Sequence, residues 1–405
     1  MIRKFVVCTI LILSTNAIRA QLTIAEYVDV VMEYSHTIAR AVATVEGAEA
    51  EYRVAKCGML PAVSLSSDAT FGFVEDGTTW SLRADVVQPI YNGGGRSAVV
   101  KQRERLFTRA ESALDGSVLA VRYEAEVTYL LLSRAEIYRQ AMRDYVAIVE
   151  RLREIVKHRF EEGYTSKSDL LQVESRLSDG HYLLSEAEQR WRIALHNFNL
   201  LRGEAAATDV ALSEGIFDSF AMPKREDVAL IITDHPDYLS AMATLESAQY
   251  GVAVRRAEYL PSINAGLFGL CNPTMKGSAD GGVLLSLNIP IFHFMERREA
   301  MRSARSEVTI SDAQLAEVVD NITQNESNGW ANLEYSHMRV EAVQRNLEVA
   351  RENLEISTYA YHEGVATILD VLQAQISWLQ IYENAIAAEY DYAVAIASYR
   401  YIVGK

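Results

Sequence analysis

A stretch of thirteen residues occurs twice in this chain, and it limits the possible folds more than any other feature. Residues 160–172 and 361–373 share a Glu-Gly pair and, six residues after the Gly, an Asp-x-Leu-Gln motif, at an offset of 201 residues. Gly accepts the left-handed backbone that ends a helix, and Thr165 or Thr367 can cap the helix that follows. Each copy therefore predicts the tip of a helical hairpin, and the chain of 405 residues is predicted to be one half, duplicated.

The first twenty residues have the pattern of a secretory signal. Arg3 and Lys4 precede an apolar run over 5–13, and Ala20 stands at a plausible cleavage point. Nine apolar residues are too few to cross a bilayer as a helix, which disfavours the alternative of a membrane anchor. The net charge of -15 argues against an extended nucleic-acid surface, because phosphate binding requires clustered cations. If this exported protein enters a membrane, it must do so with strands.

A strand hairpin is predicted after each of two Leu-Pro pairs, Leu60-Pro61 and Leu260-Pro261, where Pro stops a preceding helix. The hairpins span 62–91 and 262–292, and both end in Pro-Ile-aromatic. Apolar residues alternate with polar ones over 80–87, as in a strand between lipid and a wet lumen, whereas alternation over 284–290 is weaker. The alternative is an ordinary soluble β-hairpin. That hairpin would need a core partner, and the rest of the chain has helical patterns.

Long helices are predicted between the hairpins and the tips, over 97–158 and 296–361, because both stretches lack Pro. The first would extend about 90 Å at 1.5 Å per residue. Apolar residues there step by four and three, which is coiled-coil spacing. Return helices are expected over 168–201 and 368–402, and a helix over 22–59 precedes the first hairpin.

The domain organisation follows from these repeats. Residues 203–224 carry Gly, Asp, Ser and Pro and break the periodicity, so we interpret them as a connector against the outside of the helices, with room for one short helix. The predicted parts are a signal peptide (1–20), a first repeat (21–202) with its tip at 159–168, the connector (203–224), and a second repeat (225–405) with its tip at 361–367.

Four strands cannot close a transmembrane β-barrel, because the smallest such barrels have about eight strands. An open sheet edge in lipid would leave backbone groups unsatisfied, so several chains must contribute. Two chains would give eight strands and a barrel filled by its own side chains. Three chains would give about twelve strands and a lumen, and cyclic symmetry would let identical edges satisfy one another. We therefore expect a homotrimer.

In this order of motifs, duplicated over nearly the whole mature chain, the sequence resembles the TolC family of outer-membrane efflux proteins. The motifs are the Leu-Pro strand hairpin ending in Pro-Ile-aromatic, the long helix, and the Gly-containing tip followed by Asp-x-Leu-Gln. The resemblance implies a trimeric channel-tunnel, with a twelve-stranded β-barrel in the outer membrane of a Gram-negative bacterium and an α-helical barrel across the periplasm. It also implies partners: a periplasmic adaptor and an inner-membrane pump, in an efflux or type I secretion system.

The resemblance places a pore gate at the second tip. Asp370 matches a position where the family carries a ring of carboxylates, and three copies around an axis would focus a negative potential that favours cations. Gln373 stands where some members have a second aspartate, which predicts a weaker ring. The alternative for Asp370 is a helix N-terminal carboxylate stabilised by the macrodipole.

The resemblance also implies a latch and a docking surface at the tips. Tyr361 and Asp169 match one pair that holds the family's closed state, although Tyr361 fits equally well as a heptad core residue. Ala366 stands where a second link in some members uses an arginine, which predicts that this second link is missing. The tip residues implied in adaptor docking are Gly163, Tyr164, Thr165, Gly364, Val365 and Ala366.

No catalytic or metal-binding motif accompanies these features. The histidines form no HExxH, Cys57 and Cys271 form no CxxC, and Gly93-Gly94-Gly95 lacks the Lys-Ser/Thr of a phosphate loop. The sequence thus predicts a passive export duct without enzymatic activity or cofactor. The main alternative, an exported structural coiled-coil protein without a pore, leaves the two strand hairpins unexplained. The transported substrate and the class of pump are not encoded in these motifs.

Overall fold

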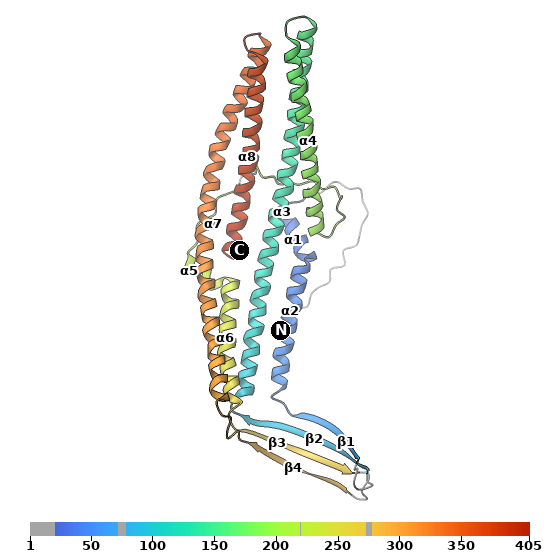
Figure 1. Cartoon of the computed structure of the whole chain (residues 1–405), viewed down its shortest axis with the longest axis vertical. Helices are drawn as coiled ribbons and strands as arrows, with labels where there is room; N and C mark the ends of the chain where they lie inside the picture. The colour runs from blue at the N-terminus through green and yellow to red at the C-terminus, as the bar shows by residue number, and fades with distance from the viewer. Residues whose placement is uncertain (1–20, 72–77, 219, 273–277) are drawn as a thin grey trace. The chain divides into compact units, whose positions relative to one another are not determined.

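The computed structural model describes residues 21–71, 78–218, 220–272 and 278–405. Within them the chain forms eight helices and four strands, which are labelled in Figure 1. The helices are α1 (Ile24–Tyr34), α2 (His36–Cys57), α3 (Gly95–Glu161), α4 (Lys167–Leu201), α5 (Val228–Asp234), α6 (Pro236–Ala257), α7 (Glu296–His362) and α8 (Ile368–Ile402). This confirms the predicted fold class, mainly helical with a small β part. The predicted signal and the hairpin turns at 72–77 and 273–277 lie outside the described residues.

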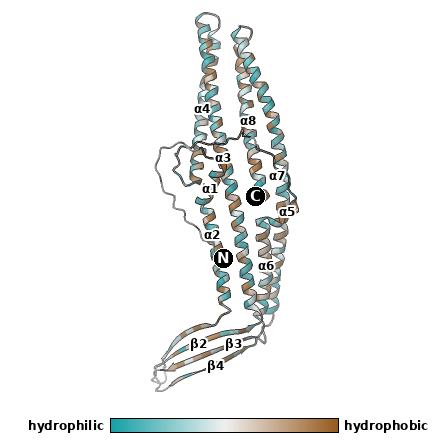
Figure 2. Ribbon diagram, turned by 180° about the vertical axis from the view of Figure 1, so that it is seen from behind, coloured by the Kyte–Doolittle hydropathy of each residue, from teal (hydrophilic) through white to brown (hydrophobic). Residues whose placement is uncertain are grey.

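Corresponding helices of the two repeats have the same length. Helices α3 and α7 each contain 67 residues, and α4 and α8 each contain 35. A helix of 67 residues extends about 100 Å at 1.5 Å per residue. Apolar and polar residues are interleaved along these helices in Figure 2. None of the described helices is both long and apolar enough to span a bilayer.

The first predicted helix, over 22–59, is in fact two helices, and this corrects the prediction. Helix α2 restarts after Ser35, whose side chain accepts a hydrogen bond from the Ile38 N–H at 3.4 Å. The same break separates α5 from α6 in the second repeat, where His235 takes the capping position 200 residues later. The capping side chains satisfy backbone donors that the new helix would otherwise leave free.

The strands form one antiparallel sheet in the order β1-β2-β3-β4 (Figure 1). Their bounds are Ala62–Phe71, Thr78–Asn92, Ser262–Asn272 and Ser278–Asn288. Pairs β1–β2 and β3–β4 are the two predicted hairpins. The central pair, β2–β3, joins the first repeat to the second, with Val86 opposite Leu267. Strands β1 and β4 therefore form the two edges of the sheet.

Strand β4 ends earlier than predicted. We expected the second hairpin to continue to Phe292, but β4 stops at Asn288, which pairs with Ser262 at the start of β3. In the first repeat, β2 reaches Asn92 because β3 runs beside it on the other side. The segment after β4 has no such neighbour within the described residues, and Pro290 has no N–H to donate.

The described residues divide into two compact units. The first contains residues up to Tyr34, Glu124–Ala221 and Ser336–Val394. Its apolar core is built from α3, α4 and α8, with Met142, Val173 and Val371 fully buried. Tyr27 of α1 stacks on Phe198 of α4 with ring centroids 3.9 Å apart, and its hydroxyl donates to the Phe198 carbonyl at 3.0 Å. Burial raises the pKa of Tyr27.

The connector is fixed to this first unit by buried groups. Ile216 is fully buried, and its N–H donates to Ser133 Oγ of α3 at 3.1 Å. The buried amide of Asn199 donates to the carbonyls of Ala206 and Thr208. The described connector residues contain turns and a bridge between Leu22 and Leu212, without the short helix for which we left room. Hydrogen bonds to Ser133 and Asn199, rather than a helix of its own, therefore hold the connector in place.

The second unit, residues Ser35–Tyr123, Met222–Tyr335 and Ala395–Lys405, contains the sheet and an ion pair with a buried carboxylate. Glu326 of α7 is fully buried. Arg225 binds it through two hydrogen bonds, Nε to Oε1 at 2.9 Å and a terminal nitrogen to Oε2 at 2.8 Å. The Tyr399 hydroxyl donates to the same carboxylate at 3.3 Å. Arg225 holds the pKa of Glu326 below its usual value. The hydrogen bonds of this group attach the segment before α5 to α7 and α8.

Candidate functional site

The first hairpin tip is built by a helix stop and a helix start. Gly163 has a φ of 82° and donates to the Phe160 carbonyl, while Tyr164 donates to the Arg159 carbonyl at 2.8 Å. This is a Schellman motif, which requires a left-handed residue and favours Gly. Ser166 then caps α4 by accepting from the Asp169 N–H, and Asp169 accepts from the Ser166 N–H in return.

The capping residue of this tip differs from the prediction. Thr165 does not cap α4; its hydroxyl donates instead to Asp169 Oδ2 at 2.6 Å. Ser166 stands three residues after the turn glycine, as Thr367 does after Gly364, and that spacing selects the cap. The hydrogen bond from Thr165 is the main reason that the pKa of Asp169 is lowered.

The second tip repeats this geometry. Gly364 has a φ of 77°, and Val365 donates to the Ala360 carbonyl at 2.8 Å. The Thr367 hydroxyl and N–H both donate to Asp370 Oδ2, at 2.7 and 2.8 Å. These bonds lower the pKa of Asp370, with the hydroxyl contributing most. Asp370 therefore stabilises the start of α8, as the alternative interpretation required. Its carboxylate is also exposed to solvent.

The two predicted gate residues lie on one face of α8. Asp370 and Gln373 are three residues apart, so their side chains are neighbours on the helix surface, and both are exposed. Behind them Ile368, Val371 and Leu372 are buried in the core of the first unit. The apolar side of α8 thus fixes the polar side in place.

The predicted latch residues are not joined within one chain. Asp169 is engaged by Thr165 and Ser166, whereas the Tyr361 hydroxyl is buried without a hydrogen-bond partner among the described residues. Tyr361 is 5% exposed and belongs to the apolar core, as its heptad position allowed.

Arg159 is a tip residue that the sequence analysis missed. It donates to the carbonyls of Tyr361 at 2.9 Å and His362 at 2.6 Å, and its guanidinium lies 4.9 Å from the centre of the Tyr361 ring. These carbonyls belong to the last turn of α7, which has no intrahelical donors for them. Helices favour cations in their last turn, and Arg159 stands in the last turn of α3. This preference is the signal by which the sequence could have identified Arg159. Arg159 therefore ties the ends of the two long helices together.

The predicted docking residues differ in exposure. Tyr164 and Val365 are 80% and 83% exposed, and an added Cβ at Gly163 or Gly364 would meet no atom within 4 Å. Thr165 and Ala366 are half-buried, and Ala366 packs on the core. Each tip thus presents one apolar or aromatic side chain on a fixed turn.

One face of the sheet is apolar across all four strands. Directly paired residues point to the same side, so the registers define each face. The exposed apolar members of this face are Val63, Leu65, Phe71, Trp80, Val86, Leu267, Val283, Leu285 and Leu287. The opposite face carries Ser64, Asp68, Asp85 and Ser286, with Arg83 paired to Asp85 at 2.8 Å. The alternation that was weak in the sequence of β4 stays incomplete in the sheet, because Leu284 lies on the opposite face together with Phe268 and Leu270.

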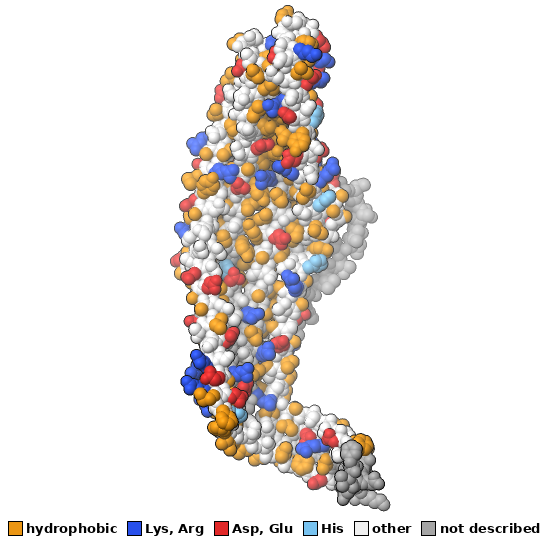
Figure 3. Space-filling model, viewed as in Figure 1, with side chains coloured by type: hydrophobic (Ala, Val, Ile, Leu, Met, Phe, Trp, Pro, Cys, Tyr) orange, Lys and Arg blue, Asp and Glu red, His pale blue; other side chains and the backbone are white. Residues whose placement is uncertain are grey.

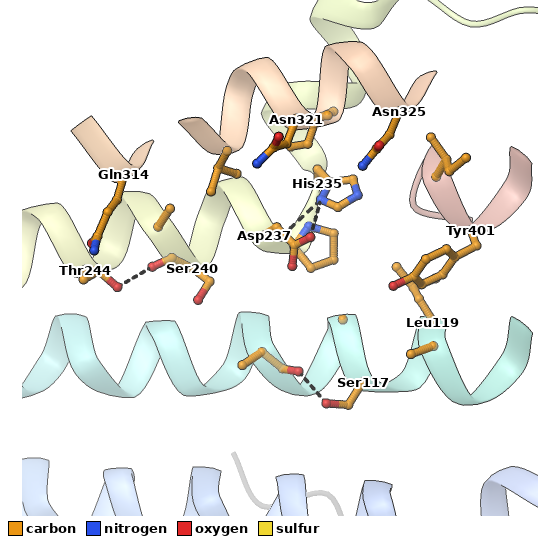
Figure 4. Close-up of a pocket in the computed structure, with 18 of the residues that line it drawn as sticks. Ser117, Leu119, His235, Asp237, Ser240, Thr244, Gln314, Asn321, Asn325 and Tyr401 are labelled. Atoms are coloured by element: carbon orange, nitrogen blue, oxygen red, sulfur yellow. Dashed lines mark hydrogen bonds and ion pairs between the residues drawn. The ribbon is translucent and has the colours of Figure 1, made fainter. Parts of the chain in front are cut away.

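A cavity of about 760 Å³ with both polar and apolar lining residues lies in the second unit, among α3, α6, α7 and the end of α8. Side chains of His235, Asn321 and Asn325 point into it in Figure 4. The described residues contain no group of three or more His, Cys, Asp or Glu side chains that could hold a metal ion. His235 Nδ1 accepts from the Asp237 N–H at 3.2 Å, so the ring caps α6 in its neutral form. Burial lowers the pKa of His235.

Replacing His235 by Asn should reduce the loss of stability in acid. Because the folded pKa of His235 lies below its unfolded value, the unfolded chain binds the proton first as the pH falls, and folding weakens below about pH 6.5. Asn can still cap the helix but does not titrate there. We expect the thermal midpoint, followed by circular dichroism, to fall less between pH 7.5 and pH 5.5 in His235→Asn than in the parent. Equal falls would show that His235 plays no part; His181→Asn, at an exposed position, is the control.

The chain contains two long helical hairpins, one in each repeat, and a four-stranded sheet with one apolar face. These features define the class of outer-membrane channel-tunnels. Residues 28–204 and 229–405 match the family described as outer membrane efflux protein, and the chain belongs to that family. This confirms the resemblance seen in the sequence and the expected location in the outer membrane, with the helices extending into the periplasm. The protein is the outer-membrane channel component of an export system, and its family and fold are those of transport channels.

Individual relatives agree with this assignment. Protein CyaE of Bordetella pertussis is 27% identical over 377 residues, which cover 88% of this chain and 79% of CyaE. The alkaline protease secretion protein AprF of Pseudomonas aeruginosa is 22% identical over 317 residues, 75% of this chain and 62% of AprF. Crystal structures of CusC, which address folding and transmembrane channel formation, superpose with a TM-score of 0.86 at 16% identity, covering 96% of this chain and 95% of CusC.

Proposed function

We propose that three copies of this chain enclose one duct, through which substrates pass passively from a periplasmic adaptor and an inner-membrane pump to the outside. The observation that carries this proposal is the sheet: its apolar face suits lipid, and its two free edges need further strands. Three chains would supply about twelve strands, enough for a closed wall around a lumen. Heat-modifiable trimers in outer-membrane fractions, and stepwise conductance in planar bilayers, would test it; a monomer without conductance would contradict it.

Adaptor docking and closure are assigned to the tips in this proposal. The fixed turns of Gly163 and Gly364 present Tyr164 and Val365 to a partner, with Thr165 and Ala366 beside them. The latch between Tyr361 and Asp169 would form in the closed state, after a rearrangement of the tips that frees the buried, unsatisfied Tyr361 hydroxyl. Both export pathways fit: the family is described as efflux, and AprF is described as a secretion protein.

The gate can be tested through ion selectivity. Three exposed Asp370 carboxylates around an axis would favour cations in the pore, so Asp370→Asn should lower the cation-to-anion permeability ratio about two- to fivefold. Asn keeps a capping oxygen, so the helix start is preserved. Gln373→Asp should raise the ratio by adding a second ring on the same helix face. Reversal potentials under a salt gradient in planar bilayers give the ratio.

Asp169→Asn is the matched control for the gate experiment. Asp169 occupies the equivalent position of the first tip and, like Asp370, accepts from a Thr hydroxyl and from the N–H of the capping residue, so it has a similar structural cost of the change. Only the second tip is assigned to the pore. Equal changes in selectivity for Asp169→Asn and Asp370→Asn would rule out a gate confined to α8.

A further inference from the structure

The segment between strand β4 and helix α7 exposes a cluster of large apolar side chains. Its most exposed members are Ile291, Phe292 and Phe294, at 91%, 70% and 87%. The rings of Phe292 and Phe294 lie with their centroids 4.5 Å apart. Ile289 and Met295 are more than half exposed as well. Exposed apolar side chains gathered in one place mark a surface that binds a partner.

The backbone of Phe294 is strained at this surface. Phe294 has a φ of 45°, the sole positive φ of a described residue other than Gly. This conformation is rare for a bulky residue. In the first repeat the same position is Gly93, which adopts a φ of 65° without that cost. Strained residues of this kind cluster at functional positions, so the exposed Phe ring is best explained by a partner outside the chain.

Positive charge follows the apolar cluster directly in the sequence. The first ten residues of α7, 296–305, contain four Arg and two Glu, whereas the rest of α7 contains three Arg and ten Asp or Glu. Figure 3 shows Arg and Lys side chains gathered beside apolar ones at the start of α7. The positive end of the helix macrodipole lies at the N-terminus and disfavours cations there. These Arg residues therefore do not stabilise the helix that carries them.

The same arginines have weak partners or none within the chain. Arg298 and Arg302 share one carboxylate, that of Glu299, at 4.0 and 3.7 Å, and both Arg side chains are exposed. Arg297 and Arg305 form no ion pair with another described residue, and both are exposed. The start of α7 therefore presents guanidinium groups that are available to an external anion.

The corresponding cations of α3 are used inside the chain. Arg103 binds Glu51 of α2 at 2.6 Å, and Arg105 binds Glu246 of α6 at 2.9 Å. Both repeats thus begin their long helix with basic residues, but those of α3 have close carboxylate partners on neighbouring helices. The difference indicates that the basic start of α7 has another use.

The sheet places this cluster at the edge of the lipid. Leu285 and Leu287 belong to its apolar face, and the exposed residues Ile289 and Ile291 continue the same two-residue spacing beyond β4. Because the helices extend into the periplasm, the segment between β4 and α7 lies at the periplasmic boundary of the membrane. At such a boundary aromatic rings gather at headgroup level, and long cationic side chains reach into the polar layer.

We propose that residues 289–305 bind anionic phospholipids of the periplasmic leaflet, with the aromatic rings among the acyl chains and the guanidinium groups on the phosphates. Guanidinium groups form paired, charge-assisted hydrogen bonds with phosphate oxygens. Phosphatidylglycerol is preferred over phosphatidylcholine, because a cluster of uncompensated cations attracts a headgroup with net negative charge. The proposal goes beyond the proposed duct: it requires the sheet to lie in the membrane, whatever the number of chains.

Quenching by spin-labelled lipids tests this preference on the whole protein. In the processed chain, with Cys57 and Cys271 changed to Ser, Met295→Cys carries a fluorophore, and the protein is reconstituted in phosphatidylcholine vesicles. A minor fraction of the lipid is then phosphatidylglycerol or phosphatidylcholine with a nitroxide at the same acyl carbon, so that only the headgroup differs. We expect the anionic lipid to quench at least about twofold more strongly. The ratio should fall at high salt, which screens exposed charges.

Two matched double variants locate the effect. Arg298→Gln combined with Arg302→Gln should bring the quenching by the two lipids close to equality. Arg345→Gln combined with Arg351→Gln should leave the preference for the anionic lipid unchanged. The second pair removes the same charge from exposed positions of the same helix, but these positions belong to the other compact unit. An equal loss in both double variants would show an effect of net charge alone and contradict a site at the start of α7.

Other results would also overturn the proposal. Absence of quenching by either lipid would place residue 295 away from the membrane, and equal quenching of the parent would exclude a preference for anionic lipid. An unchanged preference in Arg298→Gln with Arg302→Gln, with a less heat-stable trimer, would assign these arginines to a second copy of the chain. The proposed function fails through a different result, a parent that neither forms trimers nor conducts, so the two failures are distinguishable.

Discussion

Replacing Gly203 by Val is expected to destabilise the protein by about 3 kcal/mol, through backbone strain and overpacking together. Gly203 ends α4 with a φ of 76°, a conformation that a β-branched residue adopts at a cost. An added Cβ would also lie 2.4 Å from Cε2 of the Tyr34 ring. Unfolding of the detergent-solubilised protein in denaturant, followed by far-ultraviolet circular dichroism, measures the loss.

Gly404 provides a matched control for this substitution. It ends α8 at the same repeat position with a φ of 78°, and the Lys405 N–H makes the same type of helix-ending bond as Glu204. Its added Cβ would meet nothing closer than 3.9 Å. Gly404→Val should therefore cost only the backbone strain, about 1 to 2 kcal/mol. Equal losses for the two variants would mean that the contact with Tyr34 is unimportant.

Ile216→Ala should cost about 3 kcal/mol, because it removes a fully buried side chain and leaves a cavity. Ile216 is the point at which the connector enters the core of the first unit, among residues of α3 and α8. Its N–H would still donate to Ser133 Oγ, so the loss reports the side chain alone. The same denaturant titration measures it.

The next residue tests whether burial is the cause. Phe217 is 44% exposed, so Phe217→Ala should change the free energy of unfolding by less than about 1 kcal/mol even though more atoms are removed. If Phe217→Ala costs as much as Ile216→Ala, the connector is held by a surface that the single chain does not reveal.

The elements that the sequence predicted well are those with strong local signals. Pro61 and Pro261 prevent the preceding helices from continuing through them, and α2 and α6 end four residues earlier. Gly163 and Gly364 adopt the left-handed turn that their position after a helix suggested. Repetition strengthened each signal, because the same helix-ending residues at the same spacing in both repeats seldom occur by chance. The mainly helical fold followed from that order of elements, and the export function followed from the family resemblance that the same order carries.

The features that were missed depend on partners distant in the sequence. Strand β4 stops at Asn288 because its partner β3 begins at Ser262. The end of β4 therefore cannot be predicted from the sequence of β4 alone. In the sequence, Ile216 is an ordinary apolar residue of a loop. Its fixed position depends on Ser133 of α3, which accepts a hydrogen bond from its N–H. The bonds from Arg159 to the last turn of α7 join residues about two hundred positions apart. For Asp370, the sequence left two roles open, and its hydrogen bonds to Thr367 satisfy one without excluding the other.

The equal helix lengths of the two repeats restrict how such a protein can evolve. One residue inserted into α3 alone would turn all later side chains by about 100° around the helix axis and shift them by 1.5 Å. Arg159 would then miss the carbonyls of α7 that it now binds. Insertions of whole heptads preserve the facing side chains, but they must occur in both arms of both hairpins for the tips to stay level. In descendants of this gene, the tunnel should therefore lengthen or shorten by whole heptads, with the same change in all four long helices, rather than by single residues.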